Sequence, residues 1–327
     1  MRAVVLDEHG DPDVLRIDEV PDPTAGSGEV VVDVVATALN RADLLQRRGL
    51  YPGPPMDREI PGMEFAGRVA ALGPGVDSWR VGDAVMGIVG GGAYAEKLVL
   101  HERQALPVPA SVGVADAAAI PEVFLTAFDA LVVQGGLTSG RWALVHAGAS
   151  GVGTAAIQIA KALGARVIVT ASAGKLGRCT ELGADVAVDY ASTSFADAVA
   201  DVTDGQGVDV VLDVIGGEYT VANIRSLRVG GRIIQVGVMG QQKVELPLGL
   251  LLPKRAAIIG TVLRSRPLEE KIELTQRVGR ELLPRFADGT LRPVIDRRFP
   301  LDEIASAHRY MESNASVGKI LIDVGPA

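Results

Sequence analysis

The sequence of 327 residues has a single cysteine, Cys179, and only four histidines. One cysteine excludes an intrachain disulfide and a zinc site made of four cysteines. It also fits a reducing compartment, so we expect a cytoplasmic location. The histidines, which are His9, His101, His146 and His308, do not stand at metal-ligand spacings from one another. We therefore expect no metal site and a reaction that stabilises charge without a Lewis acid.

Long apolar runs and excess positive charge are also absent. The run 30–39 is interrupted by Asp33, and no run is long enough to cross a bilayer. Residues 1–8 turn acidic after a short apolar stretch, so we expect no signal peptide. The net charge of -8 disfavours nucleic acid and anionic membranes as general partners, although it allows binding of one phosphate in a local pocket. The 48% hydrophobic content suffices for a large core and more than one domain.

The hydrophobic pattern divides the chain into three segments. Residues 1–120 hold short valine-rich runs between glycine- and proline-rich turns, which predict β-strands. Residues 121–262 alternate apolar runs with helical patterns, which predicts a parallel sheet covered by helices on both faces. Residues 263–327 begin with helical patterns and end in a predicted strand at 319–324, which we expect to return to the first segment. The predicted fold class is α/β, with the middle segment inserted into a β-rich domain.

A glycine-rich turn at 146–154, His-Ala-Gly-Ala-Ser-Gly-Val-Gly-Thr, follows one predicted strand and opens a predicted helix. This context is typical of a dinucleotide-binding turn, although Ser150 replaces the usual second glycine. Glycines such as Gly148 and Gly153 let the backbone approach a diphosphate, and the helix start offers free N–H groups and a positive dipole end. The Ser150 hydroxyl can also donate to a phosphate. The alternative is a glycine-rich turn that binds nothing.

The end of the next predicted strand favours NADP over NAD. Folds that bind NAD commonly end this strand with an acidic residue, which holds the ribose 2′-OH. Here the residues are Thr170, Ala171 and Ser172, without a carboxylate. The Ser172 hydroxyl and the Lys175 ammonium suit a 2′-phosphate, and Tyr190 can add another donor. The alternative is that Ser172 caps the following helix and Lys175 is solvated.

Motifs that run from end to end of the chain add a family resemblance. They occupy residues 38–44 (Ala-Leu-Asn-Arg-Ala-Asp-Leu), 49–55, 61–67 (Pro-Gly-Met-Glu-Phe-Ala-Gly), 82–83, 119–122 (Ala-Ile-Pro-Glu), 146–158, 215–217, 263–266, 307–312 and 318–320. In combination they resemble the zinc-free quinone oxidoreductases (zeta-crystallin-like) of the medium-chain dehydrogenase/reductase superfamily, above all the p53-inducible type. Zinc-dependent relatives carry a cysteine at the position of Asn40 and a histidine at that of Met63, so both ligands are missing here.

The resemblance implies a GroES-like catalytic domain built from both chain ends, a Rossmann-type domain between them, and a homodimer. It implies NADPH-dependent hydride transfer to a quinone or related conjugated carbonyl, with NADP(H) as cofactor and a quinone or enone as substrate. Residues that match Asn40, Asp43 and Tyr51 lie near the nicotinamide or the acceptor in the family, where a polar donor stabilises the developing oxyanion. Alternatively, Asn40 and Asp43 only cap the helix predicted at 41–47, and Tyr51 only packs against neighbouring prolines.

The resemblance also implies a set of cofactor contacts. Residues at matching positions contact the diphosphate (Ser150, Gly151, Val152), the 2′-phosphate (Ser172, Lys175, Tyr190) and the nicotinamide side (Gly237, Leu263, Asn314). Arg264 is either a cofactor contact or a surface cation, and the sequence favours neither.

Two other functions stay open from the sequence. One is an enoyl reductase that acts on a conjugated thioester, a step known in related sequences, and a basic patch for a coenzyme A or carrier arm would favour it. The other is a non-catalytic NADPH-binding protein, because some zinc-free relatives serve as lens proteins and some bind AU-rich RNA. The net charge of -8 argues against broad RNA binding but not against a cofactor sensor.

Overall fold

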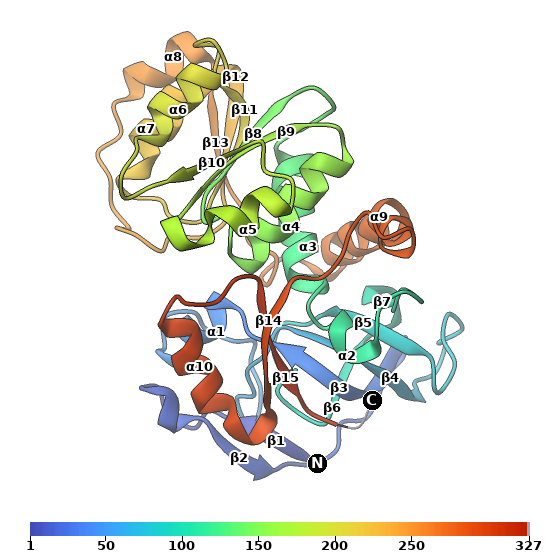
Figure 1. The fold of residues 1–327 in the computed structure, drawn as a ribbon. Coiled ribbons are helices and arrows are strands. Elements are labelled where there is room, and N and C mark those ends of the chain that lie inside the picture. Colours follow the sequence, from blue (N-terminus) through green and yellow to red (C-terminus); the bar gives the residue numbers. More distant parts are fainter. Residues whose placement is uncertain (326–327) are drawn as a thin grey trace. The chain divides into compact units, whose positions relative to one another are not determined.

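The computed structural model describes residues 1–325, and residues 326 and 327 of the expected C-terminal segment lie outside the described residues. The chain forms two compact units (Figure 1). The first, here called the N/C unit, consists of Met1–Glu122 and the chain from Arg264 onward. The second, the middle unit, is Val123–Leu263. A parallel sheet inserted between the two parts of a β-rich unit confirms the predicted fold class.

The N/C unit is built on a seven-stranded sheet. Its strands are β3 (Glu29–Ala38), β4 (Glu64–Leu72), β5 (Ala84–Ile88), β6 (Lys97–His101), β7 (Ala105–Pro107), β14 (Ile295–Pro300) and β15 (Lys319–Asp323). The order is β14-β15-β3-β4-β5-β7, and β6 also pairs with β3. β15 runs antiparallel to β3, with Leu321 opposite Ala38. The C-terminal part of the chain therefore completes the sheet that the N-terminal part begins.

Smaller elements surround this sheet. They are the paired strands β1 (Arg2–Val5) and β2 (Arg16–Glu19), and the helices α1 (Arg41–Arg47), α2 (Val114–Ala117), α9 (Leu268–Ala287) and α10 (Ile304–Glu312). Helix α3 (Pro121–Phe128) begins at the end of the first segment of this unit. Alternate residues of β3, namely Val30, Val32 and Val34, enter one hydrophobic cluster with Phe65 and Val85, as the period of a strand requires.

The middle unit contains a six-stranded parallel sheet in the order β10-β9-β8-β11-β12-β13. Its strands are β8 (Trp142–Val145), β9 (Arg166–Ala171), β10 (Val186–Asp189), β11 (Val208–Asp213), β12 (Leu227–Gln235) and β13 (Ala257–Gly260). The chain moves outward from β8 to β10 and then returns to β11 on the other side of β8. The carboxyl ends of β8 and β11 thus mark the switch point at which such sheets bind ligands.

Helices cover both faces of this sheet. They are α4 (Gly151–Ala162), α5 (Leu176–Glu181), α6 (Phe195–Val202), α7 (Tyr219–Ser226) and α8 (Leu251–Lys254). In Figure 1, α4 and α5 lie on one side of the strands and α6, α7 and α8 gather on the other. Strands covered on both faces carry continuous apolar runs, and every residue of β11 is buried.

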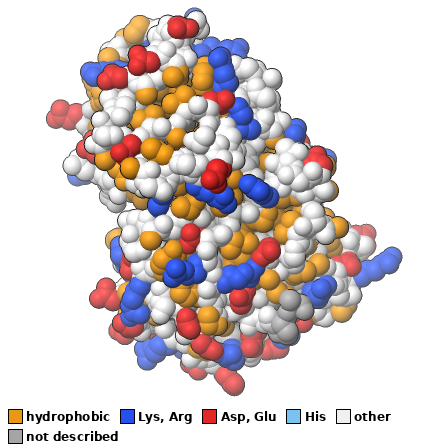
Figure 2. Space-filling view, viewed as in Figure 1, with side chains coloured by type: hydrophobic (Ala, Val, Ile, Leu, Met, Phe, Trp, Pro, Cys, Tyr) orange, Lys and Arg blue, Asp and Glu red, His pale blue; other side chains and the backbone are white. Residues whose placement is uncertain are grey.

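Within residues 1–325, no helix is both long enough and apolar enough to cross a membrane. On the face drawn in Figure 2, acidic and basic side chains are interspersed over the N/C unit rather than separated by sign. Such a distribution is typical of a solvated surface with local ion pairs.

Candidate active site and cofactor loop

Asn40 and Asp43 lie where β3 passes into α1, in the N/C unit. Asn40 is the residue before the helix, and its backbone N–H donates to Asp43 Oδ2 over 2.7 Å. This is the carboxylate half of a capping box, and it satisfies a donor that the helix itself cannot pair. The local capping role that the sequence left open is therefore present, and it fixes both side chains at the start of α1.

The Asn40 amide is held from two sides. Its Nδ2 donates to Glu64 Oε1 over 2.8 Å and, at 3.4 Å, to the Ala38 carbonyl oxygen. Its Oδ1 accepts from Lys319 Nζ over 2.8 Å. Because both amide hydrogens point at protein oxygens, Asn40 acts here as part of a buried network. Its predicted role as donor to an acceptor molecule stays a prediction.

Lys319 and Glu64 form a buried ion pair. Lys319 Nζ lies 2.7 Å from Glu64 Oε1, and their side chains are 4% and 0% exposed. The ammonium also donates to the Leu39 carbonyl oxygen over 2.6 Å and to Asn40, which uses its three hydrogens. Glu64 Oε2 accepts the backbone N–H of Glu122 over 2.8 Å. We call Asn40, Glu64 and Lys319 the Glu64–Lys319 network.

Asp43 is fully buried beside this network. Its Oδ2 also accepts from the Tyr94 hydroxyl over 2.9 Å, while Oδ1 has no hydrogen-bond partner in the described chain. Burial raises the pKa of Asp43 to about 6, against the hydrogen bonds from Asn40 and Tyr94, which lower it. The pKa of Tyr94 is raised well above its usual value, first by burial and then by the Asp43 charge. Tyr94 therefore stays a neutral donor that anchors Asp43.

Tyr51 lies in the loop after α1, under the guanidinium of Arg264. The Arg264 carbon Cζ is 5.0 Å from the centre of the Tyr51 ring, a cation–π contact. Arg264 Nε donates to the Gly90 carbonyl oxygen over 2.6 Å and Nη2 to Gln46 Oε1 over 2.8 Å. Arg264 is thus a clamp on the Tyr51 loop rather than a solvated surface cation. Burial raises the pKa of Tyr51, so the phenol keeps its proton.

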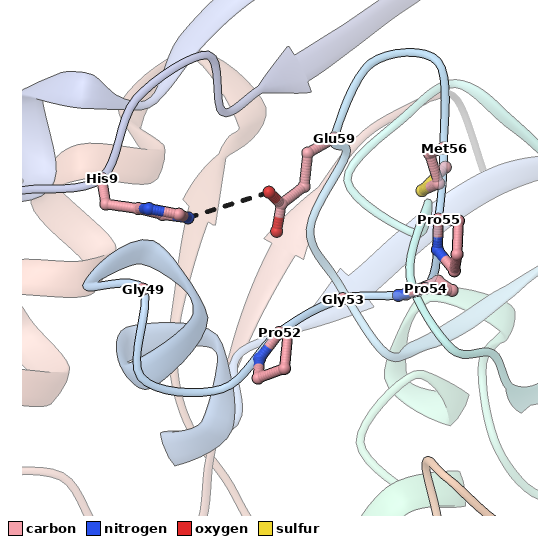
Figure 3. Close-up of a pocket in the computed structure, with 8 residues that line it drawn as sticks. All are labelled: His9, Gly49, Pro52, Gly53, Pro54, Pro55, Met56 and Glu59. Atoms are coloured by element: carbon pink, nitrogen blue, oxygen red, sulfur yellow. Dashed lines mark ion pairs between the residues drawn. The ribbon is translucent and has the colours of Figure 1, made fainter.

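The loop that follows Tyr51 borders a pocket of about 280 Å³. The pocket is lined by His9, Gly49, Pro52, Gly53, Pro54, Pro55, Met56 and Glu59. Figure 3 shows the prolines along the loop, with His9 and Glu59 facing each other at 3.9 Å. Glu59 also accepts from Gln46 Nε2 over 2.6 Å, so it joins this loop to the Arg264 clamp through Gln46.

The glycine-rich turn of the middle unit joins β8 to α4. A Cβ atom at Gly148 would lie 2.6 Å from Val169 Cβ, and one at Gly153 would lie 2.4 Å from the Ala147 carbonyl oxygen. Both positions therefore require glycine. Ser150 caps α4, since its Oγ accepts the Gly153 N–H over 3.0 Å. The hydroxyl hydrogen of Ser150 is not used by this cap, so it remains available as a donor.

The first turn of α4 carries the features of an anion site. Within residues 1–325, the backbone N–H groups of Gly151 and Val152 have no protein acceptor. They stand at the start of a helix of 12 residues, where the helix dipole favours negative charge. The turn therefore fits a diphosphate in both shape and charge.

A buried polar chain supports the same end of the sheet. His146 Nδ1 lies 3.0 Å from Thr170 Oγ1, and its Nε2 lies 2.7 Å from Asn223 Oδ1. Asn223 Nδ2 donates to Asp213 Oδ2 over 2.9 Å, so the amide oxygen must accept and His146 carries its hydrogen on Nε2. Burial lowers the pKa of His146 and keeps the ring neutral. These contacts tie together the ends of β8, β9 and β11, from which the cofactor turn starts.

Ser172, Lys175 and Tyr190 lie beyond the ends of β9 and β10. Ser172 precedes a short 3-10 turn (Ala173–Lys175), but its side chain makes no capping hydrogen bond. Lys175 is the last residue of that turn. The Tyr190 N–H donates to the Ala171 carbonyl oxygen over 3.4 Å, which brings Tyr190 beside the end of β9. The three predicted residues are therefore neighbours on one edge of the sheet.

Asp189 at the end of β10 is a carboxylate that the sequence argument did not consider. It stands opposite Ala171 in the sheet. Its Oδ1 accepts the Ala191 N–H over 3.1 Å and its Oδ2 accepts from Ser192 Oγ over 3.0 Å. The carboxylate thus closes its own turn, and β9 itself ends without an acid.

The other predicted cofactor residues are divided between the units. Gly237 follows β12, and its carbonyl oxygen accepts from Gln235 Nε2 over 2.6 Å. Leu263 is a buried residue at the end of the middle unit. Asn314 lies after α10 in the N/C unit, with a φ of 56° and its Oδ1 2.7 Å from Arg41 Nη2. Neither unit by itself contains the full predicted set.

Three important residues were not singled out from the sequence. They are Glu64, Glu122 and Lys319, although each belongs to a motif named above. The sequence pattern could have indicated two of them, Glu64 and Lys319, because each is a charged residue at the start of a strand that is otherwise largely apolar and buried. Two opposite charges at buried strand ends indicate an ion pair, since an unpaired buried charge is very costly.

The Glu64–Lys319 pair generates a stability prediction. Replacing Lys319 with methionine leaves the Glu64 carboxylate buried without a cation, and we expect a loss of about 3–5 kcal/mol in the free energy of unfolding. Adding Glu64→Gln to Lys319→Met should recover a large part of this loss, because the glutamine is neutral and can still accept the Glu122 N–H. Urea unfolding of the wild type and both variants measures this. A loss below about 1 kcal/mol for Lys319→Met would contradict the assignment.

Comparison with known proteins assigns the family. Residues 26–110 match the alcohol dehydrogenase GroES-like domain, and residues 182–322 match the zinc-binding dehydrogenase family. Despite the name of the second family, no three His, Cys, Asp or Glu side chains within 1–325 are arranged to hold a metal ion. The chain is 32% identical over its whole length to the synaptic vesicle membrane protein VAT-1 homolog of Rattus norvegicus, of which it covers 85%.

Quinone oxidoreductases occur among both the relatives and the solved structures. The quinone oxidoreductase-like protein 2 homolog of Nematostella vectensis is 31% identical over 98% of this chain and 88% of its own length. The Escherichia coli quinone oxidoreductase complexed with NADPH superimposes with a TM-score of 0.90 at 28% identity, over 99% of this chain and all of that one.

Two further solved structures represent other activities. An NAD-dependent alcohol dehydrogenase reaches a TM-score of 0.89 at 34% identity, over 99% of this chain and 100% of that one. The JamJ enoyl reductase reaches 0.89 at 26% identity, over 99% of both chains. The fold and the matches over nearly full length agree with the resemblance read from the sequence. The chain belongs to the quinone oxidoreductase family of the medium-chain dehydrogenase/reductase superfamily.

Proposed function

We propose that this protein is an NADPH-dependent reductase that transfers a hydride to a quinone or a related conjugated carbonyl without using a metal. The observation that carries the proposal is the turn before α4. There Gly148 and Gly153 leave room for a close approach, and the N–H groups of Gly151 and Val152 have no protein acceptor. A dinucleotide diphosphate satisfies both features.

The dinucleotide, when bound, supplies the hydride, and the protein supplies binding and orientation. In this proposal the first turn of α4 binds the diphosphate, with the Ser150 hydroxyl as an additional donor. Ser172, Lys175 and Tyr190 supply a hydroxyl, an ammonium and a phenol to the 2′-phosphate. The Asp189 carboxylate, opposite the end of β9, accepts hydrogen bonds from the Ala191 N–H and the Ser192 hydroxyl in its own turn, and β9 itself ends without an acid.

On the acceptor side we assign the donor role to Tyr51. Its phenol keeps its proton at neutral pH and can donate to the carbonyl oxygen on which negative charge develops. Arg264 holds the Tyr51 ring from one side, and Asn40 and Asp43 fix the start of the helix that precedes the loop. Quinone reduction needs little further help, because the aromatic product is stable.

The contacts of the Glu64–Lys319 network support a reaction without a metal ion. Asn40 Oδ1 and Glu64 Oε1 are the oxygens of this network that could ligate a metal ion, and both already accept from the Lys319 ammonium. A metal ion there would have to displace a buried positive charge or lie beside it, and like charges at such distances repel strongly.

A second candidate function is the reduction of a conjugated enoyl thioester. The structural similarity to the JamJ enoyl reductase favours this candidate. Quinone reduction and enoyl-thioester reduction would both take a hydride from the same dinucleotide, and both would require a hydrogen-bond donor for the oxyanion that develops. A basic surface for a coenzyme A or carrier arm would be required in addition. A protein that binds NADPH without oxidising it is the remaining alternative.

The direct test of the proposed function is a comparison of NADPH and NADH oxidation across ortho- and para-quinones, enones and enoyl-CoA esters. We expect turnover with 1,2-naphthoquinone, and a kcat/KM for NADPH at least about 10-fold above that for NADH, because each charge-assisted hydrogen bond to the 2′-phosphate contributes about 1.5–3 kcal/mol. Faster turnover with crotonyl-CoA than with the quinone would favour the enoyl reductase. Tight NADPH binding without oxidation by any acceptor would favour the non-catalytic role.

Replacing Lys175 with alanine tests the 2′-phosphate assignment separately. We expect the KM for NADPH to rise about 10-fold or more and that for NADH to change little, because only NADPH carries the phosphate that the ammonium binds. Arg178→Ala is the matched control, since Arg178 is an exposed cation of the next helical turn, where it pairs with Glu181. Equal effects of Lys175→Ala on both cofactors would remove the assignment.

A further inference from the structure

Ala147, in the turn between β8 and α4, has a left-handed backbone with a φ of 52°. Glycine, asparagine and aspartate adopt this region at low cost, whereas the Cβ atom of an alanine crowds the neighbouring carbonyl oxygen there. Backbone strain of this kind persists only where the surrounding structure holds it, and it concentrates at functional sites. The contacts that hold Ala147 are therefore candidates for a role in cofactor binding.

The backbone on both sides of Ala147 is anchored to a neighbouring strand. The His146 N–H donates to the Leu212 carbonyl oxygen of β11 over 3.1 Å. The Gly148 N–H donates to the Thr170 carbonyl oxygen of β9 over 2.8 Å. The chain therefore turns between two fixed points, and Ala147 takes the left-handed conformation between them.

The His146 side chain is fully buried and is fixed at both ring nitrogens. Nδ1 lies 3.0 Å from Thr170 Oγ1, and Nε2 lies 2.7 Å from Asn223 Oδ1. The rings of Phe195 and Tyr219 pack edge-to-face against the imidazole, with centroids 4.8 and 4.9 Å away. A ring held in this way has one orientation, so it fixes the backbone at the start of the turn.

Asp213 sets the direction of this hydrogen-bond chain and connects it to the loop after β11. Its Oδ2 accepts from Asn223 Nδ2 over 2.9 Å, so the Asn223 amide oxygen faces His146. Its Oδ1 accepts the N–H groups of Ile215 over 2.7 Å and Gly216 over 3.0 Å. The turn after β8 and the loop after β11 border the switch point of the sheet, and the hydrogen-bond chain joins the two.

The conformation of Ala147 is coupled to the start of α4. The Ala147 carbonyl oxygen accepts the Ser150 N–H over 2.9 Å, and Ser150 in turn caps the helix. A rotation of the backbone at Ala147 would therefore move the first turn of the helix. The N–H groups of Gly151 and Val152, which the proposed function assigns to the diphosphate, would move with it.

We propose that His146 is a positioning residue of the dinucleotide site, which keeps Ala147 in the left-handed conformation and so aims the start of α4 at the diphosphate. This inference rests on the proposed function, because it requires the dinucleotide to bind at this turn. His146 is fully buried, so it acts through the turn rather than by touching the cofactor. Asn223 and Asp213 act through His146.

Replacing His146 with phenylalanine tests this role, because phenylalanine keeps a ring against Phe195 and Tyr219 but makes neither hydrogen bond. The turn can then relax, and the apparent dissociation constant rises by the inverse of the fraction that stays competent to bind. We expect the dissociation constants of NADPH and NADH to rise together by about 5- to 30-fold, which corresponds to the cost of a left-handed alanine. Both should rise because the two cofactors share the diphosphate. Fluorescence titration measures them without turnover.

Glycine at position 147 separates positioning from stability. Glycine adopts a positive φ without a steric cost, so adding Ala147→Gly to His146→Phe should return both dissociation constants most of the way to the wild-type values. Val208→Ala, at the other end of β11, is the matched control. It leaves a buried cavity and lowers the stability to urea, but it should not change the affinity for either cofactor.

Thr170→Val is a milder variant that removes only the contact with His146 Nδ1. It should raise both dissociation constants in the same direction but by less, and it serves if His146→Phe does not fold. Nitrogen-15 NMR of the wild type tests the hydrogen-bond chain without a cofactor. We expect the imidazole hydrogen on Nε2, where Asn223 Oδ1 accepts it.

Unchanged dissociation constants in folded His146→Phe or Thr170→Val would overturn the positioning role and leave the proposed function standing. A loss of affinity that Ala147→Gly does not restore, or an equal loss in Val208→Ala, would also overturn it. An imidazole hydrogen on Nδ1 would contradict the chain that starts at Asp213. If the wild type binds neither NADPH nor NADH, the proposed function fails and the positioning role fails with it.

Discussion

The buried ion pair between Glu64 and Lys319 is the interaction on which the candidate site depends. It joins β4 to the last strand of the chain, and it holds the Asn40 amide and the backbone of Glu122 in fixed positions. Each of these polar groups has its hydrogen-bond partners only when the others are in place. A buried polar network that lacks some of its hydrogen bonds is less stable than an apolar core. The site therefore requires the last strand, β15, to be paired with β3 in the sheet of the N/C unit.

Much of the fold follows from local patterns, because the elements that the sequence predicts are those with a strong periodicity. The turn at Gly148–Gly153 is one example, since a strand, a tight turn and a helix follow one another within a few residues. β14 is a counterexample, because its sequence Ile-Asp-Arg-Arg-Phe-Pro is mostly exposed and only pairing with β15 makes it a strand. A 3-10 turn at Ala173–Lys175 precedes α5, in a segment that contains Gly174 and Gly177, and no pattern in the sequence indicated this turn.

Less of the candidate site than of the fold could be predicted from the sequence, because its contacts join residues that are far apart in the chain. Asn40 and Lys319 are 279 positions apart, and no local spacing indicates that they share a hydrogen bond. The same holds for Arg264, which the sequence left between two roles and which packs over the Tyr51 ring while it donates to Gln46 and Gly90. Helix capping by Asp43 could be predicted because it depends on a spacing of three residues. The accounts of Asn40, Glu122 and Arg264 all require the tertiary structure.

The central claim is that amide, ammonium and carboxyl groups complete this site without a metal ion. The most direct measurement is a titration of chelator-treated protein with Zn²⁺, in which bound metal is counted after dialysis and NADPH-dependent quinone reduction is followed in the same samples. The account predicts full turnover before any zinc is added and no stoichiometric zinc after dialysis. One retained zinc ion per chain, with turnover that rises in proportion to it, would contradict the account.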